Sequence, residues 1–125
     1  MSFNAVGSVG ATANNKRIKI IYNPTAAVVG STVSGGTIIA DTGTSTVSGA
    51  GWSLSAQVFK YGAAGSNTQL AIHQAAQVGS IVSSLIAPAA VTAVESGAIL
   101  VAVTGNAGTA TSDIILNFFE PSGSN

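Results

Sequence analysis

Hydrophobic and polar residues alternate through the middle of the chain, from Gly51 to Gly62. The apolar positions Trp52, Leu54, Ala56 and Val58 are separated by serine and glutamine residues. A period of two is typical of a β-strand with one buried face, so this stretch predicts a central strand. Phe59 and Tyr61 then place aromatic rings on the face that was polar. This change indicates that a second sheet, a loop or another subunit covers that end of the strand.

Further short apolar stretches, separated by turn residues, predict strands on either side of the central one. Residues 16–22 place Ile18, Ile20 and Tyr22 on one face and Arg17, Lys19 and Ile21 on the other. The other predicted strands are 25–33, 37–40, 91–94, 98–104 and 112–119, with 44–48 as a short strand or a loop. Two segments stay open: 69–78 fits a strand or a helix, and 81–86 a strand or a short helical turn.

About eight short strands with few helix signals predict an all-β fold. Their spacing of roughly 8–14 residues favours an antiparallel β-sandwich, jelly-roll-like in its arrangement. A chain of 125 residues is one domain with room for a real core. We expect residues 1–15 to form an N-terminal arm or a short edge strand, 16–121 the sandwich domain and 122–125 a tail.

The composition indicates a protein whose surface is covered by partners. Ala, Gly, Ser and Thr make up about half of the chain, 46% of residues are hydrophobic and the formal net charge is zero. Only 6% of residues are charged, against roughly 25% in an ordinary soluble domain. A lone globule of this kind is poorly protected against association, so we expect an assembly. The alternative is a small-residue β protein that stays soluble alone.

Targeting and membrane signals are weak in this sequence. The first residues lack a basic region followed by an apolar core, so they do not predict a secretory signal. The absence of cysteine excludes disulfides and cysteine metal sites. The uncharged run 61–94 is interrupted by Gly, Ser and Pro and does not predict a membrane helix. We therefore expect a chain that is made and folded inside a cell.

Catalytic chemistry has few candidates here. Glu95 and Asp113 stand at predicted turns and are expected to be solvated carboxylates, with one weak calcium site as the alternative. His73 is the single histidine and no Gly-x-Ser-x-Gly elbow accompanies it, so we expect a structural or interface role. No phosphate-binding loop is present. The sequence predicts no enzyme activity, no metal and no cofactor.

Lys16, Arg17 and Lys19 form the one basic cluster. They are typical of a solvated strand edge, where positive charge also discourages edge-to-edge aggregation. The alternative is a contact with an acidic partner surface. Because no broad basic patch accompanies them, nucleic-acid binding is not expected.

The last third of the chain has a pattern found in a known class of proteins. A short strand and a glycine turn in 91–97 lead to a long apolar strand, a polar hairpin and the final Ile114-Ile-Leu-Asn-Phe-Phe-Glu-Pro121. This order resembles the closing strands of trimeric jelly rolls of the complement and tumour-necrosis-factor type. The whole chain is similar in composition to small bacteriophage virion proteins, particularly capsid decoration (cement) proteins. It lacks the aromatic-rich central strands of the complement type.

This resemblance implies a homotrimer bound where capsid subunits meet. Its partners would be copies of itself and the major capsid protein, and it would be located in the virion after synthesis in the host cytoplasm. The interface candidates are Phe3 with the N-terminal arm, Phe59 and Tyr61, together with the basic residues above. Burial in the core is the alternative for Phe59 and Tyr61.

Other functions fit the same sequence. One is a tail, neck or fibre component of a phage. Another is a surface-polymer subunit such as a pilin, which the missing signal and disulfide oppose. A third is a carbohydrate-binding module in which Trp52 and Tyr61 stack on sugars.

Overall fold

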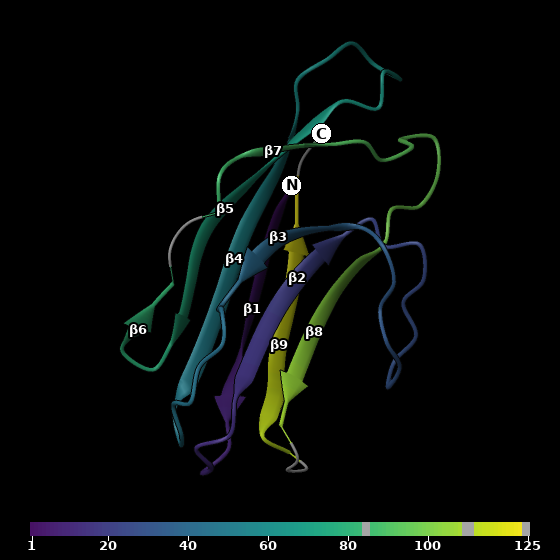
Figure 1. Cartoon of the computed structure of the whole chain (residues 1–125). Helices are drawn as coiled ribbons and strands as arrows, with labels where there is room; N and C mark the ends of the chain where they lie inside the picture. The colour runs from purple at the N-terminus through teal and green to yellow at the C-terminus, as the bar shows by residue number, and fades with distance from the viewer. Residues whose placement is uncertain (84–85, 109–111, 124–125) are drawn as a thin grey trace.

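Two antiparallel β-sheets pack face to face in the computed structural model (Figure 1). The structure describes residues 1–83, 86–108 and 112–123, and every regular element in these ranges is a strand. The predicted all-β antiparallel sandwich is therefore confirmed. In chain order the strands of the described ranges are β1 (Ser2–Val9), β2 (Lys16–Tyr22), β3 (Thr37–Asp41), β4 (Gly51–Lys60), β5 (Gln69–Val78), β6 (Ile81–Val82), β7 (Ala89–Val91), β8 (Val101–Ala107) and β9 (Ile114–Ser122).

The larger sheet has the order β6-β5-β4-β1-β9, with β7 also beside β5, and the smaller sheet has the order β3-β2-β8. The alternating stretch of the sequence is β4, the middle strand of the larger sheet. Its apolar positions Trp52, Leu54, Ala56 and Val58 are all buried, as their period of two predicts.

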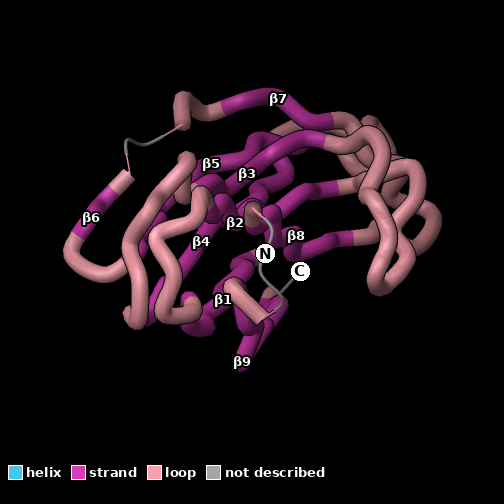
Figure 2. Tube along the Cα trace, turned by 60° about the horizontal axis from the view of Figure 1, so that its bottom comes forward, coloured by secondary structure: helices cyan, strands magenta, loops and turns pink. Residues whose placement is uncertain are grey.

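The two halves of the chain pair in a nested, jelly-roll-like way. The first strand β1 pairs with the last strand β9, and β2 pairs with β8. The remaining long strands are added beyond β1 and β2, where β4 pairs with β1 and β3 with β2. As a result β9 ends the larger sheet and β8 ends the smaller one, on the same side of the sandwich (Figures 1 and 2).

One hydrophobic core lies between the sheets. The Phe3 ring of β1 and the Tyr22 ring of β2 meet edge to face, with their centroids 6.2 Å apart. Such a pair contributes about 0.5–1.5 kcal/mol beyond its buried area. The largest fully buried side chains are Tyr22, Phe3, Lys16, Ile18, Ile20, Ile39, Leu54 and Val78.

The prediction of an N-terminal arm or edge strand at residues 1–15 is wrong. Ser2–Val9 forms β1, which is hydrogen-bonded to β4 on one side and to β9 on the other. Gly7 permits this position, because a Cβ there would lie 1.9 Å from the Ile115 carbonyl oxygen and 2.6 Å from the Trp52 ring. At the other end, Ser122 pairs with Ser2, so β9 extends into the predicted tail.

The structure decides one segment that the sequence left open and corrects two predicted strands. Residues 69–78 form strand β5 rather than a helix, since pairing with β4 and the burial of Ala71, Ala76 and Val78 override helix propensity. The strand predicted at 98–104 begins at Val101 and continues to Ala107. Residues 25–33 form no strand and make only an isolated bridge, Ala26 with Ser34.

Smaller segments complete this comparison. Residues 44–48 are a loop in which Ser45 makes an isolated bridge to Lys16. The predicted strand 91–94 is β7, shifted to Ala89–Val91. Within 81–86 only β6 is a strand, and residues 84–85 lie outside the described ranges.

Candidate functional site

Two of the six predicted interface residues are in the core. Phe3 and Lys16 are each 1% exposed, so neither is on an interface of the folded chain. Phe3 belongs to the inward face of β1. Lys16 shares the inward face of β2 with Ile18 and Ile20, because alternate residues of a strand point to the same side. Both assignments to an interface are therefore corrected.

Lys16 is a structural residue whose ammonium group is held by backbone carbonyls. Its Nζ donates to the carbonyl oxygens of Thr12 at 2.6 Å, Asn14 at 3.0 Å and Val47 at 3.3 Å. An ammonium group has three protons to donate, so this set satisfies it. Lys16 thereby joins the turn after β1 to the loop before β4.

Arg17 and Lys19 are on the outer face of the smaller sheet, separated from Lys16. The Arg17 Nε donates to Asp41 Oδ1 at 2.9 Å, and its terminal nitrogen contacts Oδ2. Burial of Asp41 opposes ionisation, but the hydrogen bonds from Arg17 and from the Gly43 N–H outweigh it and lower the pKa of this carboxyl. The three residues of the predicted basic cluster are therefore in different settings. Lys16 is in the core, Arg17 is in an ion pair with Asp41, and Lys19 is on the outer face of the sheet.

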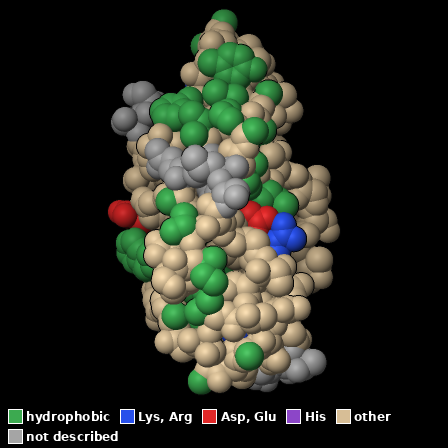
Figure 3. Space-filling view, turned by 60° about the vertical axis from the view of Figure 1, so that its left-hand side comes forward, with side chains coloured by type: hydrophobic (Ala, Val, Ile, Leu, Met, Phe, Trp, Pro, Cys, Tyr) green, Lys and Arg blue, Asp and Glu red, His purple; other side chains and the backbone are tan. Residues whose placement is uncertain are grey.

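Phe59 and Tyr61 are exposed at the end of β4, at 44% and 62%. Figure 3 shows that hydrophobic side chains gather toward this end of the molecule, and that charged side chains are few on the face it draws. Trp52 differs, because it is 4% exposed and its Nε1 donates to the carbonyl oxygens of Ser8 and Ile115, each at 3.2 Å. It is therefore not available to stack on a sugar, which corrects that expectation.

A groove of about 840 Å³ opens beside Phe59, between the two sheets. On its wall Lys60 Nζ lies 2.8 Å from Glu95 Oε1, and Gln69 Nε2 donates to the same oxygen at 2.7 Å. The hydrogen bond from Lys60 lowers the pKa of Glu95, with Gln69 adding to it. Burial raises the pKa of Tyr22, and the negative charge of Glu95 raises it further. Lys60, Gln69 and Glu95 therefore form one hydrogen-bonded group on the wall of the groove.

The side of the sandwich formed by β8 and β9 is an uncovered apolar surface that sequence reasoning missed. In the described part of the chain β9 pairs only with β1, so its other edge is free. Ile115, Leu116 and Phe118 are 43%, 48% and 52% exposed. In β8 no residue is charged, and in β9 Glu120 alone is. We call these two strands with their exposed side chains the open side.

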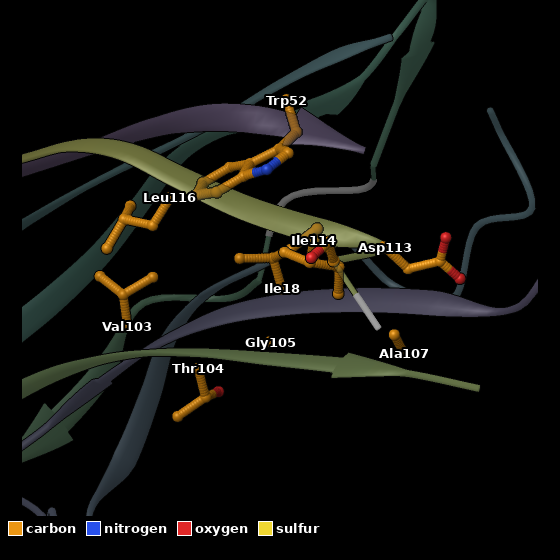
Figure 4. A pocket seen from close by; sticks show the side chains of 10 residues that line it. Ile18, Trp52, Val103, Thr104, Gly105, Ala107, Asp113, Ile114 and Leu116 are labelled. Carbon is orange, nitrogen blue, oxygen red and sulfur yellow. The ribbon is translucent and has the colours of Figure 1, made fainter. Parts of the chain in front are cut away.

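At the open side the two sheets do not close over the core (Figure 4). Val103 of β8 and Leu116 of β9 point toward one another into an opening of about 270 Å³, and Ile18 and Trp52 lie at its inner wall. Where Gly105 faces Ile114 the sheets come closer, since a Cβ on Gly105 would already lie 3.1 Å from Ile114 Cγ2. The opening therefore exposes core side chains at an edge.

Asp113 closes the lower end of this opening with a buried polar network. Its carboxylate accepts hydrogen bonds from Thr12 Oγ1 at 2.7 Å and from Asn14 Nδ2 at 3.1 Å. The hydrogen bond from Thr12 holds the pKa of Asp113 below its usual range, helped by Asn14 and by the charge of Lys16. Asp113 is thus a structural carboxylate at 3% exposure, rather than the solvated turn residue that the sequence predicted.

The described residues contain no group of three or more His, Cys, Asp or Glu placed to share a metal ion. Glu95 and Asp113 lie in separate networks at different ends of the sandwich. The side chain of His73 is outside the described part of the structure. No helix in the described ranges is long and apolar enough to cross a membrane.

Comparisons of this chain with protein-family models, with curated proteins and with solved structures gave no match.

Proposed function

We propose that this chain is a structural subunit of a bacteriophage virion, a capsid decoration subunit that assembles with copies of itself and binds the major capsid protein. The observation that carries the proposal is the open side, where an apolar strand edge and core side chains are uncovered. The buried networks around Asp113 and Lys16 are satisfied within the chain, whereas the side chains left uncovered at the open side are apolar.

A free strand edge is a liability for a protein that acts alone. Unpaired N–H and C=O groups attract other strands, and monomeric proteins protect such edges with lysine, proline or a covering loop. On β9 the five residues from Ile114 to Phe118 contain no charge and no proline. Full burial of one large apolar side chain contributes about 1.5–3 kcal/mol, so covering Leu116 and Phe118 would favour association.

The charge balance supports association between identical copies. The whole chain has four basic and four acidic residues, and its formal net charge is zero. Arg17 with Asp41 and Lys60 with Glu95 are already paired inside one copy. Two copies therefore meet with little electrostatic repulsion.

The virion assignment rests on the resemblance to capsid decoration proteins in the strand pattern of the last third and in composition. A homotrimer placed where capsid subunits meet needs a stable β-core and two apolar surfaces, one toward its copies and one toward the shell. The open side would supply the first, and the exposed Phe59 and Tyr61 end is our candidate for the second. A tail, neck or fibre component would use the same surfaces.

The experiment that tests this function is co-sedimentation with empty heads assembled from the major capsid protein of the same genome. We expect wild-type chain to sediment with heads to saturation, in multiples of three copies. Phe59→Ser/Tyr61→Ser should reduce head binding while the oligomer persists. Val82→Ser, at an exposed apolar residue of β6, is the control and should bind as wild type does. Binding to isolated tails and not to heads would favour the tail alternative, and binding to neither would refute a virion role.

A further inference from the structure

The segment between β2 and β3 is an ordered hairpin with its own hydrogen bonds. The Thr25 N–H donates to the Ser34 carbonyl at 2.9 Å, and the Ser34 N–H donates to the Ala26 carbonyl at 3.0 Å. Thr25 Oγ1 adds a bond to the Ser34 carbonyl at 3.0 Å. We call residues 23–36 the β2–β3 hairpin; it lies beside β8 in Figure 1.

The tip of this hairpin is a tight turn with an apolar surface. The Ser31 N–H donates to the Val28 carbonyl at 3.0 Å, and Gly30 has φ +79° at the third position, as a type II turn requires. Turn tips usually have polar residues. Here Val28 is 67% exposed and Val29 is fully exposed. The fold therefore presents two valines in a defined turn, and the described part of the chain leaves both exposed.

The hairpin does not pack tightly on its own sheet. A gap of about 480 Å³ separates its residues 30–33 from Lys19, Ile21 and Thr104 on the outer face of the smaller sheet. Within the described residues the buried Thr104 Oγ1 has no hydrogen-bond partner. A hairpin that was only a covering loop would be expected to close this gap.

We propose that the Val28–Val29 tip docks on the open side of a neighbouring copy, against Leu116 and Val103. This inference rests on the proposed self-assembly and names the surface that covers the open side. A chain's own tip lies over the outer face of its smaller sheet, whereas Val103 and Leu116 point between the sheets (Figure 4). The tip therefore reaches a neighbour's opening rather than its own.

Charge and position both fit this contact. Neither the hairpin nor β8 has a charged residue, so neither surface loses solvated charge when they meet. The hairpin and the open side also lie on the same side of the molecule (Figures 1 and 2). A tip and an opening can pair reciprocally in a twofold dimer or head-to-tail in a closed ring, and the trimer we propose uses the ring. Three copies around one axis would bury three tips and three openings.

The first test uses the absence of native cysteine. Val29→Cys and Leu116→Cys variants are mixed, oxidised and analysed on a non-reducing gel, and the linked peptides are identified by mass spectrometry. We expect a 29–116 link between chains. A mixture of Val82→Cys with Leu116→Cys should give no such link, because Val82 of β6 is at the far edge of the larger sheet.

The second test is the oligomer dissociation constant of Val28→Ser/Val29→Ser by light scattering. We expect it to rise about tenfold or more, with an unchanged circular dichroism spectrum. One result combines an oligomeric wild type and a monomeric Leu116→Lys with a Val28→Ser/Val29→Ser variant that assembles as wild type does and a Val29→Cys variant that forms no link to Leu116→Cys. That result would overturn this inference and leave the self-assembly intact. A monomeric wild type would overturn the self-assembly itself.

Discussion

At the scale of single residues, the contact of Gly7 with Trp52 determines how three strands fit together. Trp52 of β4 lies across the inner side of Gly7 in β1, and its indole N–H reaches a carbonyl of β9. The indole thus occupies space that a side chain at position 7 would block, and its N–H group is hydrogen-bonded there. Both residues are therefore sensitive to substitution.

Replacing Trp52 by alanine should lower the free energy of unfolding by about 3–5 kcal/mol, because it leaves a cavity and removes the donor to Ser8 and Ile115. Urea titration followed by circular dichroism measures this change. Tyr61→Ala is the matched aromatic control and should change stability by less than about 0.5 kcal/mol, since Tyr61 is largely exposed. Equal effects of the two substitutions would contradict the placement of Trp52.

Gly7→Ala should destabilise the protein by about 1–3 kcal/mol, because the new methyl group overlaps the Ile115 carbonyl and the Trp52 ring. Gly51→Ala, in the neighbouring strand, is the control. A Cβ at Gly51 meets only the Gly7 carbonyl, at an ordinary 3.7 Å. Thermal unfolding of both variants is the measurement, and a Gly7→Ala variant as stable as Gly51→Ala would show that β1 lies elsewhere.

Sequence reasoning at this scale succeeded where side chains alternate and failed where they are small or long. Trp52 and its alternate neighbours were assigned to a buried face from their period. Phe3 was assigned to an interface because Ala5 and Gly7 around it give little hydrophobic contrast. Lys16 was assigned to a solvated edge because charge outweighed its position, although carbonyls of the preceding turn, at Thr12 and Asn14, and of the distant Val47 surround its ammonium group.

At the scale of elements, one polar network fastens the start of β9 to the turn between β1 and β2. Thr12 and Asn14 of that turn both donate to Asp113, and the Gly10 N–H donates to its carbonyl at 2.9 Å. Lys16 adds positive charge nearby. The network fixes the lower end of the open side.

This network predicts a stability that depends on pH. The folded-state pKa of Asp113 is below its ordinary value, so its contribution is present above about pH 4 and is lost as pH falls through the folded pKa. The unfolding temperature should therefore drop more steeply between pH 5 and pH 2 in wild type than in Asp113→Asn. Asp41 and Glu95, whose pKa values are also lowered, leave a residual slope in the variant. Identical slopes would contradict the network.

The elements themselves were largely predictable from local patterns. The alternation in β2 and β4 identified both strands. The strand expected at residues 25–33 was wrong because its β-branched residues have no sheet partner and form the exposed turn of the hairpin instead. The start of β8 was placed three residues early, since an apolar run does not reveal where pairing begins; β2 supplies that limit, with Tyr22 opposite Val101.

At the scale of the whole molecule, the function we propose depends on the strand order, which places β9 at one edge of the larger sheet and β8 at one edge of the smaller sheet. The pairing of β1 with β9 and of β2 with β8 joins residues about a hundred positions apart, and no local pattern specifies it. The composition alone indicated that some surface is covered. The strand order adds that β8 and β9 end the two sheets, with Leu116 and Phe118 exposed, which makes this side our candidate for that surface.

The measurement that tests the central claim most directly is the solution mass of the wild-type chain and of Leu116→Lys, by light scattering on a sizing column at two salt concentrations. We predict a wild-type mass near three times 12.2 kDa, insensitive to salt because the contact is apolar, and a monomeric Leu116→Lys that remains folded. Val82→Lys, the exposed control on β6, should keep the wild-type mass. A wild-type chain that is monomeric at all concentrations, or a Leu116→Lys variant that assembles as wild type does, would contradict the account.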